Sequence, residues 1–208
     1  LEPGEKGAGH SRGRGVSMII FDCEIAKAIP GTTEEQIEFC AGWDDFHGMG
    51  ISAICAWDTK RNMPYVFLPD NLGDFEKLCH RQYIAGFNSK GFDDKLLAAN
   101  GIRVSTDYDV LEEVRVATGQ PREYAGGVTR RGYTLDALAV ANLLTGKGGN
   151  GAHAPVLYQK GRFGELVTYC LRDVMLTRAL LHRGRLEDPT RPGAYFDLDP
   201  RWQWEARL

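Results

Sequence analysis

The stretch IIFDCEIAKA, residues 19–28, sets two carboxylates directly after an apolar run. The run predicts a buried strand, which we expect to span residues 18–25. Side chains alternate between the two faces of a strand, so Asp22 and Glu24 should point to one face and Cys23 to the other. Two neighbouring like charges repel each other unless a positive group lies between them. The rest of the sequence must therefore account for that positive group.

The overall composition is that of an ordinary globular protein. The chain has 208 residues, of which 43% are hydrophobic and 25% are charged, and its formal net charge is −3. This length fits one domain with a sizeable core. The slightly acidic balance argues against a small basic-arm binder of nucleic acid, although it is compatible with a local basic groove. No apolar run approaches the roughly 20 residues that span a bilayer, so we expect no membrane association.

Five cysteines are scattered along the chain without a CxxC pair, which favours reduced thiols over a disulfide framework or a zinc site. They are Cys23, Cys40, Cys55, Cys79 and Cys170. We therefore expect core or half-buried thiols in a cytoplasmic protein.

The chain divides into three parts. Residues 1–17 carry charge and glycine without an apolar segment, and we expect a disordered leader or an added extension, with Met18 as a natural start. Residues 18–188 are expected to form one domain. Residues 189–208 form a proline-punctuated, aromatic tail that the sequence does not place.

Strands precede helices in the domain. The predicted strands span residues 18–25, 50–58, 63–69 and 83–88, and the predicted helices span 72–82, 91–101, 134–144 and 164–184. Thr134 is a candidate N-cap, and Gly184 ends the last helix. Residues 107–119 fit either a strand followed by a helix or one helix, and 119–133 and 145–155 are predicted loops. This order indicates an α/β domain with a mixed central sheet flanked by helices.

Two further acidic positions follow. Asp93 starts a predicted helix just after the strand that ends at Asn88, and side chains at such junctions are often functional in α/β proteins. The plain alternative is that Asp93 and Asp94 only complement the helix macrodipole. Tyr169 and Asp173 lie four residues apart on the last helix and therefore share a face. The alternative there is an exposed aspartate beside an amphipathic tyrosine.

Taken together, Asp22, Glu24, Asp93 and Asp173 suit a divalent cation. Four hard oxygen donors that converge on one point favour Mg²⁺ or Mn²⁺. Two such ions form a clamp for phosphodiester hydrolysis, because one activates a water and the other stabilises the leaving oxygen. Metal is then the positive partner that Asp22 and Glu24 require.

The three acidic segments, in their order, resemble the motifs of the DEDD superfamily of 3′–5′ exonucleases, which has a ribonuclease H-like fold. Its Asp-x-Glu motif is matched by FDCE, its Asn-then-Phe-Asp motif by NSKGFD, and the Tyr-x-x-x-Asp motif of its tyrosine-containing branch by YCLRD. The runs GFNSKGFD, YTLDALAVANLLTGK and YCLRDVMLTRALL are similar to the proofreading domains of family B DNA polymerases. The resemblance covers residues 18–184.

The resemblance implies a role for each matched residue. Asp22, Glu24, Asp93 and Asp173 would be the ligands of two divalent metal ions, Mg²⁺ or Mn²⁺. Tyr169 would hydrogen-bond and orient the attacking water.

Three residues beside the ligands would meet the substrate. The resemblance implies that Asn88 and Phe92 line the cleft near the terminal nucleotide. Ile25 departs from the family pattern, because many members carry a small or hydroxyl residue there that contacts the terminal sugar. Asp94 is the alternative ligand in the second motif, although the match aligns Asp93.

These residues predict a metal-dependent exonuclease that releases nucleoside 5′-monophosphates from the 3′ end of single-stranded nucleic acid. The preference for DNA rests on the polymerase-like motifs alone, and an RNA exonuclease with the same site is the runner-up. A catalytically silent binding module would be expected to have lost acidic ligands, which are all present here. A proofreading subunit that acts with a separate polymerase is a further alternative. The chain leaves no room for a polymerase region, so we expect a stand-alone nuclease domain or a fragment of a longer protein.

Other signals are less specific. Arg122, Arg130, Arg131, Lys147 and Lys160 lie in predicted loops, where they fit phosphate contacts and solvated charge equally. The four tryptophans favour packing in the core or tail over a base-stacking platform. They are Trp43, Trp57, Trp202 and Trp204.

Overall fold

The computed structural model describes residues 18–125, 131–146 and 151–199. The strands are β1 (Met18–Ile25), β2 (Ile51–Asp58), β3 (Met63–Phe67), β4 (Tyr83–Gly86), β5 (Tyr108–Asp109), β6 (Arg185–Glu187) and β7 (Tyr195–Asp197). The helices are α1 (Phe46–Met49), α2 (Gly73–Cys79), α3 (Asp93–Ala99), α4 (Val110–Ala117), α5 (Leu135–Leu143), α6 (Ala154–Gln159) and α7 (Phe163–Arg183), with a 3₁₀ turn at Gly151–His153. The predicted leader 1–17, Arg130, Lys147, Trp202 and Trp204 lie outside the described residues.

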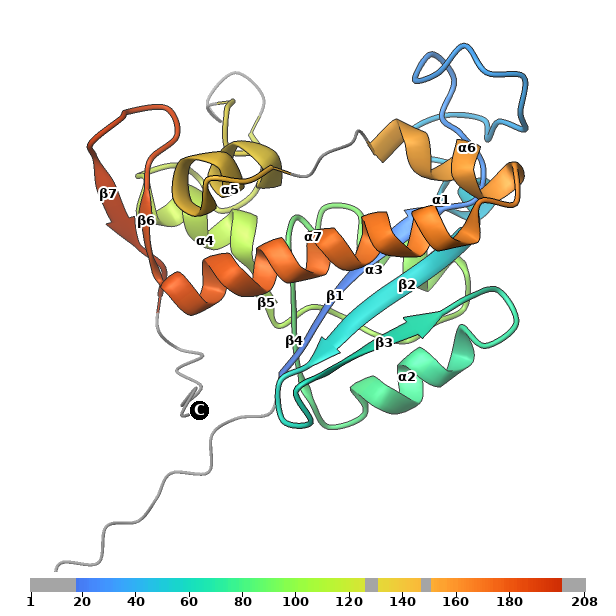
Figure 1. Cartoon of the computed structure of the whole chain (residues 1–208), viewed down its shortest axis with the longest axis horizontal. Coiled ribbons are helices and arrows are strands. Elements are labelled where there is room, and N and C mark those ends of the chain that lie inside the picture. The colour runs from blue at the N-terminus through green and yellow to red at the C-terminus, as the bar shows by residue number, and fades with distance from the viewer. Residues whose placement is uncertain (1–17, 126–130, 147–150, 200–208) are drawn as a thin grey trace, which may run out of the picture.

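A mixed sheet with helices on both faces forms the centre of the molecule (Figure 1). Its five strands pair in the order β3-β2-β1-β4-β5. β1 is antiparallel to β2 and parallel to β4, while β2 and β3 are antiparallel and β4 and β5 are parallel. The predicted α/β domain with a mixed central sheet flanked by helices is therefore confirmed.

The alternation of side chains on β1 decides which residues face which helices. Ile19 and Phe21 pack in the cluster that includes residues of α2 and α3. Ile20 packs on the other face, in the cluster that includes residues of α4, α5 and α7. Asp22 and Glu24 continue the series of Ile20, so they face α7, which crosses the sheet in front of β1 and β2 in Figure 1.

Several local predictions are settled by the structure. Residues 107–119 form a strand followed by a helix, β5 and α4. Thr134 caps α5 by accepting a hydrogen bond from the backbone N–H of Ala137 at 3.1 Å, and Gly184 follows the end of α7 with φ of 66°. α1 and α6 were not expected, because four and six residues are too few for an apolar repeat to show. α6 therefore replaces the end of the predicted loop 145–155 with a helix.

The five cysteines are buried with free thiols, as the sequence predicts. No helix among the described residues has the length and apolar character that crossing a membrane requires.

A hairpin of β6 and β7 follows α7 and packs against the same core. Leu186, Phe196 and Leu198 are 0%, 8% and 3% exposed and belong to the cluster that also contains α5 and α7 residues. The hairpin therefore spans the boundary that the sequence suggests after residue 188, and it places residues 195–198 against the domain core.

Asp188 ties this hairpin to the segment that precedes α5. Its side chain is fully buried and accepts hydrogen bonds from Thr190 (Oγ1, 2.7 Å), Arg191 (Nε, 2.7 Å) and the hydroxyl of Tyr133 (3.1 Å). Burial alone would raise the pKa of Asp188, but the hydrogen bonds from Thr190, Arg191 and Tyr133 outweigh it and lower the pKa to about 2. The ionised carboxylate therefore stabilises the hairpin.

We expect Asp188→Asn to lower the free energy of unfolding by about 2 kcal/mol at pH 7 and by roughly half as much at pH 3. The folded pKa of Asp188, near 2, lies below the ordinary aspartate pKa of 3.8. The ionised carboxylate therefore makes its full contribution to the free energy of unfolding above pH 3.8. This contribution is lost as the pH falls through the folded pKa. Urea denaturation at both pH values measures the difference. Asp197→Asn, at an exposed position on β7, is the matched control, and an equal loss at both pH values would contradict the assignment.

Candidate active site

A cavity of about 900 Å³ opens on the α7 side of β1. Three of the segments that line it are far apart in the sequence: β1, the turn into α3, and α7. All eight positions predicted from the sequence are among the lining residues. They are Asp22, Glu24, Ile25, Asn88, Phe92, Asp93, Tyr169 and Asp173.

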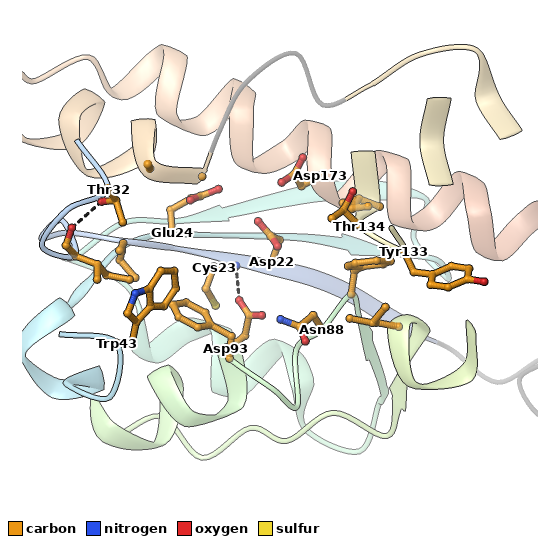
Figure 2. Close-up of a pocket in the computed structure, with 18 of the residues that line it drawn as sticks. Asp22, Cys23, Glu24, Thr32, Trp43, Asn88, Asp93, Tyr133, Thr134 and Asp173 are labelled. Carbon is orange, nitrogen blue, oxygen red and sulfur yellow. Dashed lines mark hydrogen bonds between the residues drawn. The ribbon is translucent and has the colours of Figure 1, made fainter. Parts of the chain in front are cut away.

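The acidic face of β1 forms the floor of the cavity. Asp22 is half-buried and Glu24 is 6% exposed, and both point toward the space below α7 in Figure 2. Cys23 points to the other face of the strand, as the alternation predicts. The ladder with β2 shifts register between Glu24 and Ile25, where the strand ends at the cavity. Asp22 and Glu24 therefore lie side by side at the end of the central strand.

Asp93 reaches β1 from the start of α3. Its Oδ1 accepts a hydrogen bond from the backbone N–H of Cys23 at 3.0 Å, and the side chain is 5% exposed. Burial and then the nearby charge of Asp22 raise the pKa of Asp93 well above its usual range. Asp94 does not line the cavity, because its carboxylate accepts hydrogen bonds from the backbone N–H and the hydroxyl of Thr106 at 3.0 and 2.8 Å.

α7 closes the cavity with Tyr169 and Asp173, which lie one turn apart on the same face of the helix. Asp173 is 2% exposed. Cys170 lies between them in the sequence, and its thiol donates to the backbone oxygen of Asp22 at 3.4 Å. The helix thus brings its own carboxylate to the acidic face of β1, as Figure 2 shows for Asp173, Asp22 and Glu24.

The donor atoms of this site fit a hard divalent cation. One oxygen each of Asp22 and Glu24 and the sulfur of Cys170 lie within 4.8 Å of one another, and this is the only such group among the described residues. Burial raises the pKa of the Cys170 thiol well above its usual range, so it stays neutral and the charged donors are carboxylates. Asp93 and Asp173 lie outside this tight group but line the same cavity. A cation between buried carboxylates stabilises their ionised form.

A single buried carboxylate organises the turn that leads into Asp93. Asp109 accepts hydrogen bonds from the backbone N–H groups of Asn88 (2.9 Å), Lys90 (3.0 Å) and Leu111 (2.9 Å). It therefore caps α4 and holds Asn88, which has a φ of 59°, in the left-handed region. Sequence reasoning missed this residue, although the run DVLE at 109–112 has the pattern of a helix start.

Other lining residues were also missed. Trp43 was expected in the core, but its side chain is 64% exposed and lines the cavity on one side of the acidic cluster. Tyr124 is 65% exposed and also lines it. Arg131, which the sequence offered as a candidate phosphate contact, lines it too. These positions depend on loop placement, which no periodic pattern in the sequence reports.

Arg122 and Lys160, by contrast, do not line the cavity. Arg122 pairs with Glu112 and Glu113, and Lys160 lies 2.8 Å from Glu35. Both basic residues are therefore committed to ion pairs of the fold.

Comparison with known proteins identifies the fold. No protein-family model matches the chain, and no curated protein matches its sequence. Among solved structures, the family B DNA polymerase from the hyperthermophilic archaeon Pyrobaculum calidifontis is similar, with a TM-score of 0.52 and 17% sequence identity over 81% of this chain. The matched region is 24% of the polymerase chain, so this chain spans about a quarter of its length. The predicted ribonuclease H-like fold is thereby confirmed, and the match is to a polymerase of the family that the motifs resemble.

We expect Asp109→Ala to lower the free energy of unfolding by about 2–3 kcal/mol, because three partly buried backbone N–H groups lose their acceptor. Asp109→Asn should cost less, since its remaining carbonyl oxygen still accepts. Urea denaturation measures both. Asp70→Ala, at an exposed turn position, is the control and should stay within about 0.5 kcal/mol of the wild type. A similar loss in Asp109→Ala and Asp70→Ala would show that Asp109 does not hold the turn.

Proposed function

We propose that the protein is a metal-dependent 3′–5′ exonuclease of the tyrosine-containing branch of the DEDD superfamily. It hydrolyses phosphodiester bonds at the 3′ end of single-stranded nucleic acid, DNA in preference to RNA, and releases nucleoside 5′-monophosphates. One observation carries the proposal: three segments distant in sequence converge on one cavity with the residue types and order of the three motifs. The fold shared with a family B DNA polymerase supports it.

The acidic residues would hold the metal. Asp22, Glu24, Asp93 and Asp173 offer only oxygen donors, and three of these side chains are at most 6% exposed. Such a set suits two Mg²⁺ or Mn²⁺ ions. When bound, the ions would supply an activated water and stabilise charge on the phosphate and on the leaving oxygen.

Tyr169 would position the attacking water. Its side chain lines the cavity one helical turn from Asp173, so its hydroxyl and that carboxylate act on the same space. A phenol hydroxyl can donate to the water and hold its lone pair toward the phosphorus.

The remaining predicted residues would meet the terminal nucleotide. Phe92 packs edge-on against Phe46, with ring centroids 5.6 Å apart, so its ring is a fixed wall of the cavity. Asn88 offers an amide beside it. Ile25 lines the cavity with an apolar side chain, which cannot hydrogen-bond a sugar hydroxyl, so the preference for DNA rests on the polymerase-like motifs.

A single strand is the substrate that the cavity fits. The acidic groups lie between β1 and α7, and three of them are at most 6% exposed, so a base-paired terminus would have to fray before its last phosphodiester could reach them. The buried free thiols fit a reducing compartment, and we place the enzyme in the cytoplasm. A polymerase or other replication protein is a partner compatible with this activity.

We expect degradation of 5′-labelled single-stranded DNA from its 3′ end with Mg²⁺ or Mn²⁺ and none with EDTA. Asp22→Asn and Asp173→Asn should each lower the rate by at least about 10³-fold, because each removes a charged ligand. Gel analysis of timed samples shows the ladder. Asp70→Asn is the control. It removes one negative charge, as the two variants do, but it changes an exposed residue outside the cavity.

RNA of matched sequence in the same assay gives the DNA-to-RNA ratio, which should lie above one. A faster RNA reaction would favour the RNA exonuclease. If the folded wild-type protein cleaves neither DNA nor RNA, the proposal is wrong, and a binding module or a subunit that requires a polymerase is favoured.

Tyr169→Phe should lower kcat by about 10- to 100-fold and leave KM nearly unchanged, because the lost hydroxyl acts on the water and not on substrate binding. Steady-state kinetics with the same DNA measure both constants. Tyr158→Phe, on α6 and outside the cavity, is the matched control. Mn²⁺ binding by calorimetry should be the same in both variants. A Tyr169→Phe enzyme with wild-type kcat would remove this residue from the mechanism.

A further inference from the structure

The cavity extends well beyond the acidic residues. Its other side is lined by α4 and by the segment between α4 and α5, through Leu111, Arg115, Tyr124, Arg131, Tyr133 and Thr134. In Figure 2, Tyr133 and Thr134 lie on the side of Asp22 that is opposite to Trp43. We call Arg115, Tyr124, Arg131 and Tyr133 the basic aromatic wall. The acidic cluster thus occupies only part of the cavity.

Tyr124 lies two residues after Arg122, which is bound to helix α4. Arg122 pairs with Glu113 and lies 3.5 Å from Glu112, and both of these carboxylates are buried on α4. The backbone oxygen of Arg122 also accepts a hydrogen bond from Arg115 at 3.3 Å. The 65% exposed ring of Tyr124 is therefore an aromatic surface beside the cavity, next to an arginine that pairs with two buried carboxylates.

The other members of the wall supply fixed shape and positive charge. Tyr133 is 4% exposed, and its hydroxyl bonds to Asp188, so its ring cannot swing out of the wall. Arg131 is exposed two residues before it. Arg115 is half-buried and has no carboxylate partner within the described parts of the chain. Its guanidinium lines the cavity and donates to the backbone oxygen of Arg122.

This combination of groups recognises a single nucleic-acid strand. Aromatic faces stack on any base, and guanidinium groups bind backbone phosphates. The acidic cluster repels every phosphate that a cation does not hold, so the rest of the strand is drawn toward the arginines. A cavity of about 900 Å³ is at the upper end of the range for sites that enclose a whole drug-sized ligand, which leaves room for more than the terminal nucleotide.

The geometry points to a second subsite in which the basic aromatic wall binds the strand upstream of the 3′-terminal nucleotide. Tyr124 stacks on a base, and Arg115 and Arg131 contact backbone phosphates. The subsite rests on the proposed function, because it takes the substrate of the acidic cluster.

The test separates binding of a strand from hydrolysis of a terminal nucleotide. Binding is measured by fluorescence anisotropy of 5′-labelled octathymidylate in EDTA, over a series of salt concentrations. Hydrolysis with Mg²⁺ uses octathymidylate and thymidine 5′-(p-nitrophenyl phosphate), which has no upstream nucleotide and yields p-nitrophenolate and thymidine monophosphate. The variants are Tyr124→Ala and Arg115→Ala. Their matched controls are Tyr195→Ala and Arg183→Ala, which change exposed residues outside the cavity.

Tyr124→Ala and Arg115→Ala should each weaken octathymidylate binding by roughly 5- to 100-fold, while the controls bind as the wild type does. Arg115→Ala should also reduce the slope of log K against log salt by about 0.7, the loss of one single-strand phosphate contact. In both variants, the loss of kcat/KM for octathymidylate should exceed the loss for the small ester at least about fivefold.

Octathymidylate binding equal to that of the wild type, with the same salt slope, would overturn the subsite. If the wild type also hydrolyses both substrates, the proposed function stands without it. Selective loss of octathymidylate binding in an enzyme that hydrolyses neither substrate would support the subsite and reject the exonuclease. A wild type that binds no octathymidylate would overturn the subsite.

Discussion

Like charges gathered on one face of the central strand are the constraint on which the rest of the structure depends. Asp22 and Glu24 continue the face of β1 that also carries buried Ile20, so burying the apolar part of the strand brings the acidic part under α7. Asp93 is added from the other side of β1 by a hydrogen bond to its backbone. The two hydrophobic clusters on opposite faces of the sheet provide the stability that offsets the cost of this arrangement.

The geometry of the cavity is held by residues that do not line its acidic part. Asp109 fixes the turn before α3 through three backbone N–H groups. Ser89 lies within that turn and leaves no room for a side chain on Gly86, because a Cβ there would come 2.6 Å from the Ser89 Oγ. On the far side, Gln159 at the end of α6 bonds the backbone of Ala26 and Glu38 and so ties down the loop that follows β1. Each wall is thus positioned by a buried or bridging polar group, so little of the site depends on flexible side chains.

The parts of the fold and site that could be predicted are those set by interactions between residues close in the sequence. The period of two in β1 and the spacing of four in α7 are local, and they correctly placed Asp22, Glu24 and Asp173 toward a common space. The junction at Asp93 was also visible, because a strand leads directly into a helix. Trp43 was placed wrongly, since the exposure of a loop residue is set by contacts far away in the sequence. The short helices α1 and α6 and the hairpin β6–β7 were missed for the same reason, as their stability comes from tertiary packing and not from local pattern.

The bond between Tyr133 and Asp188 also constrains the order in which the cavity can be assembled during synthesis. A ribosome delivers β1, α3 and α4 first, and α7 with its Asp173 only after most of the domain has emerged. The hydrogen-bond partners of the Tyr133 hydroxyl, Asp188 and Thr190, are synthesised later still. The cavity can therefore be completed only after the last described hairpin has been synthesised. The acidic residues of β1 are consequently brought under α7 only when nearly the whole domain is available to bury them.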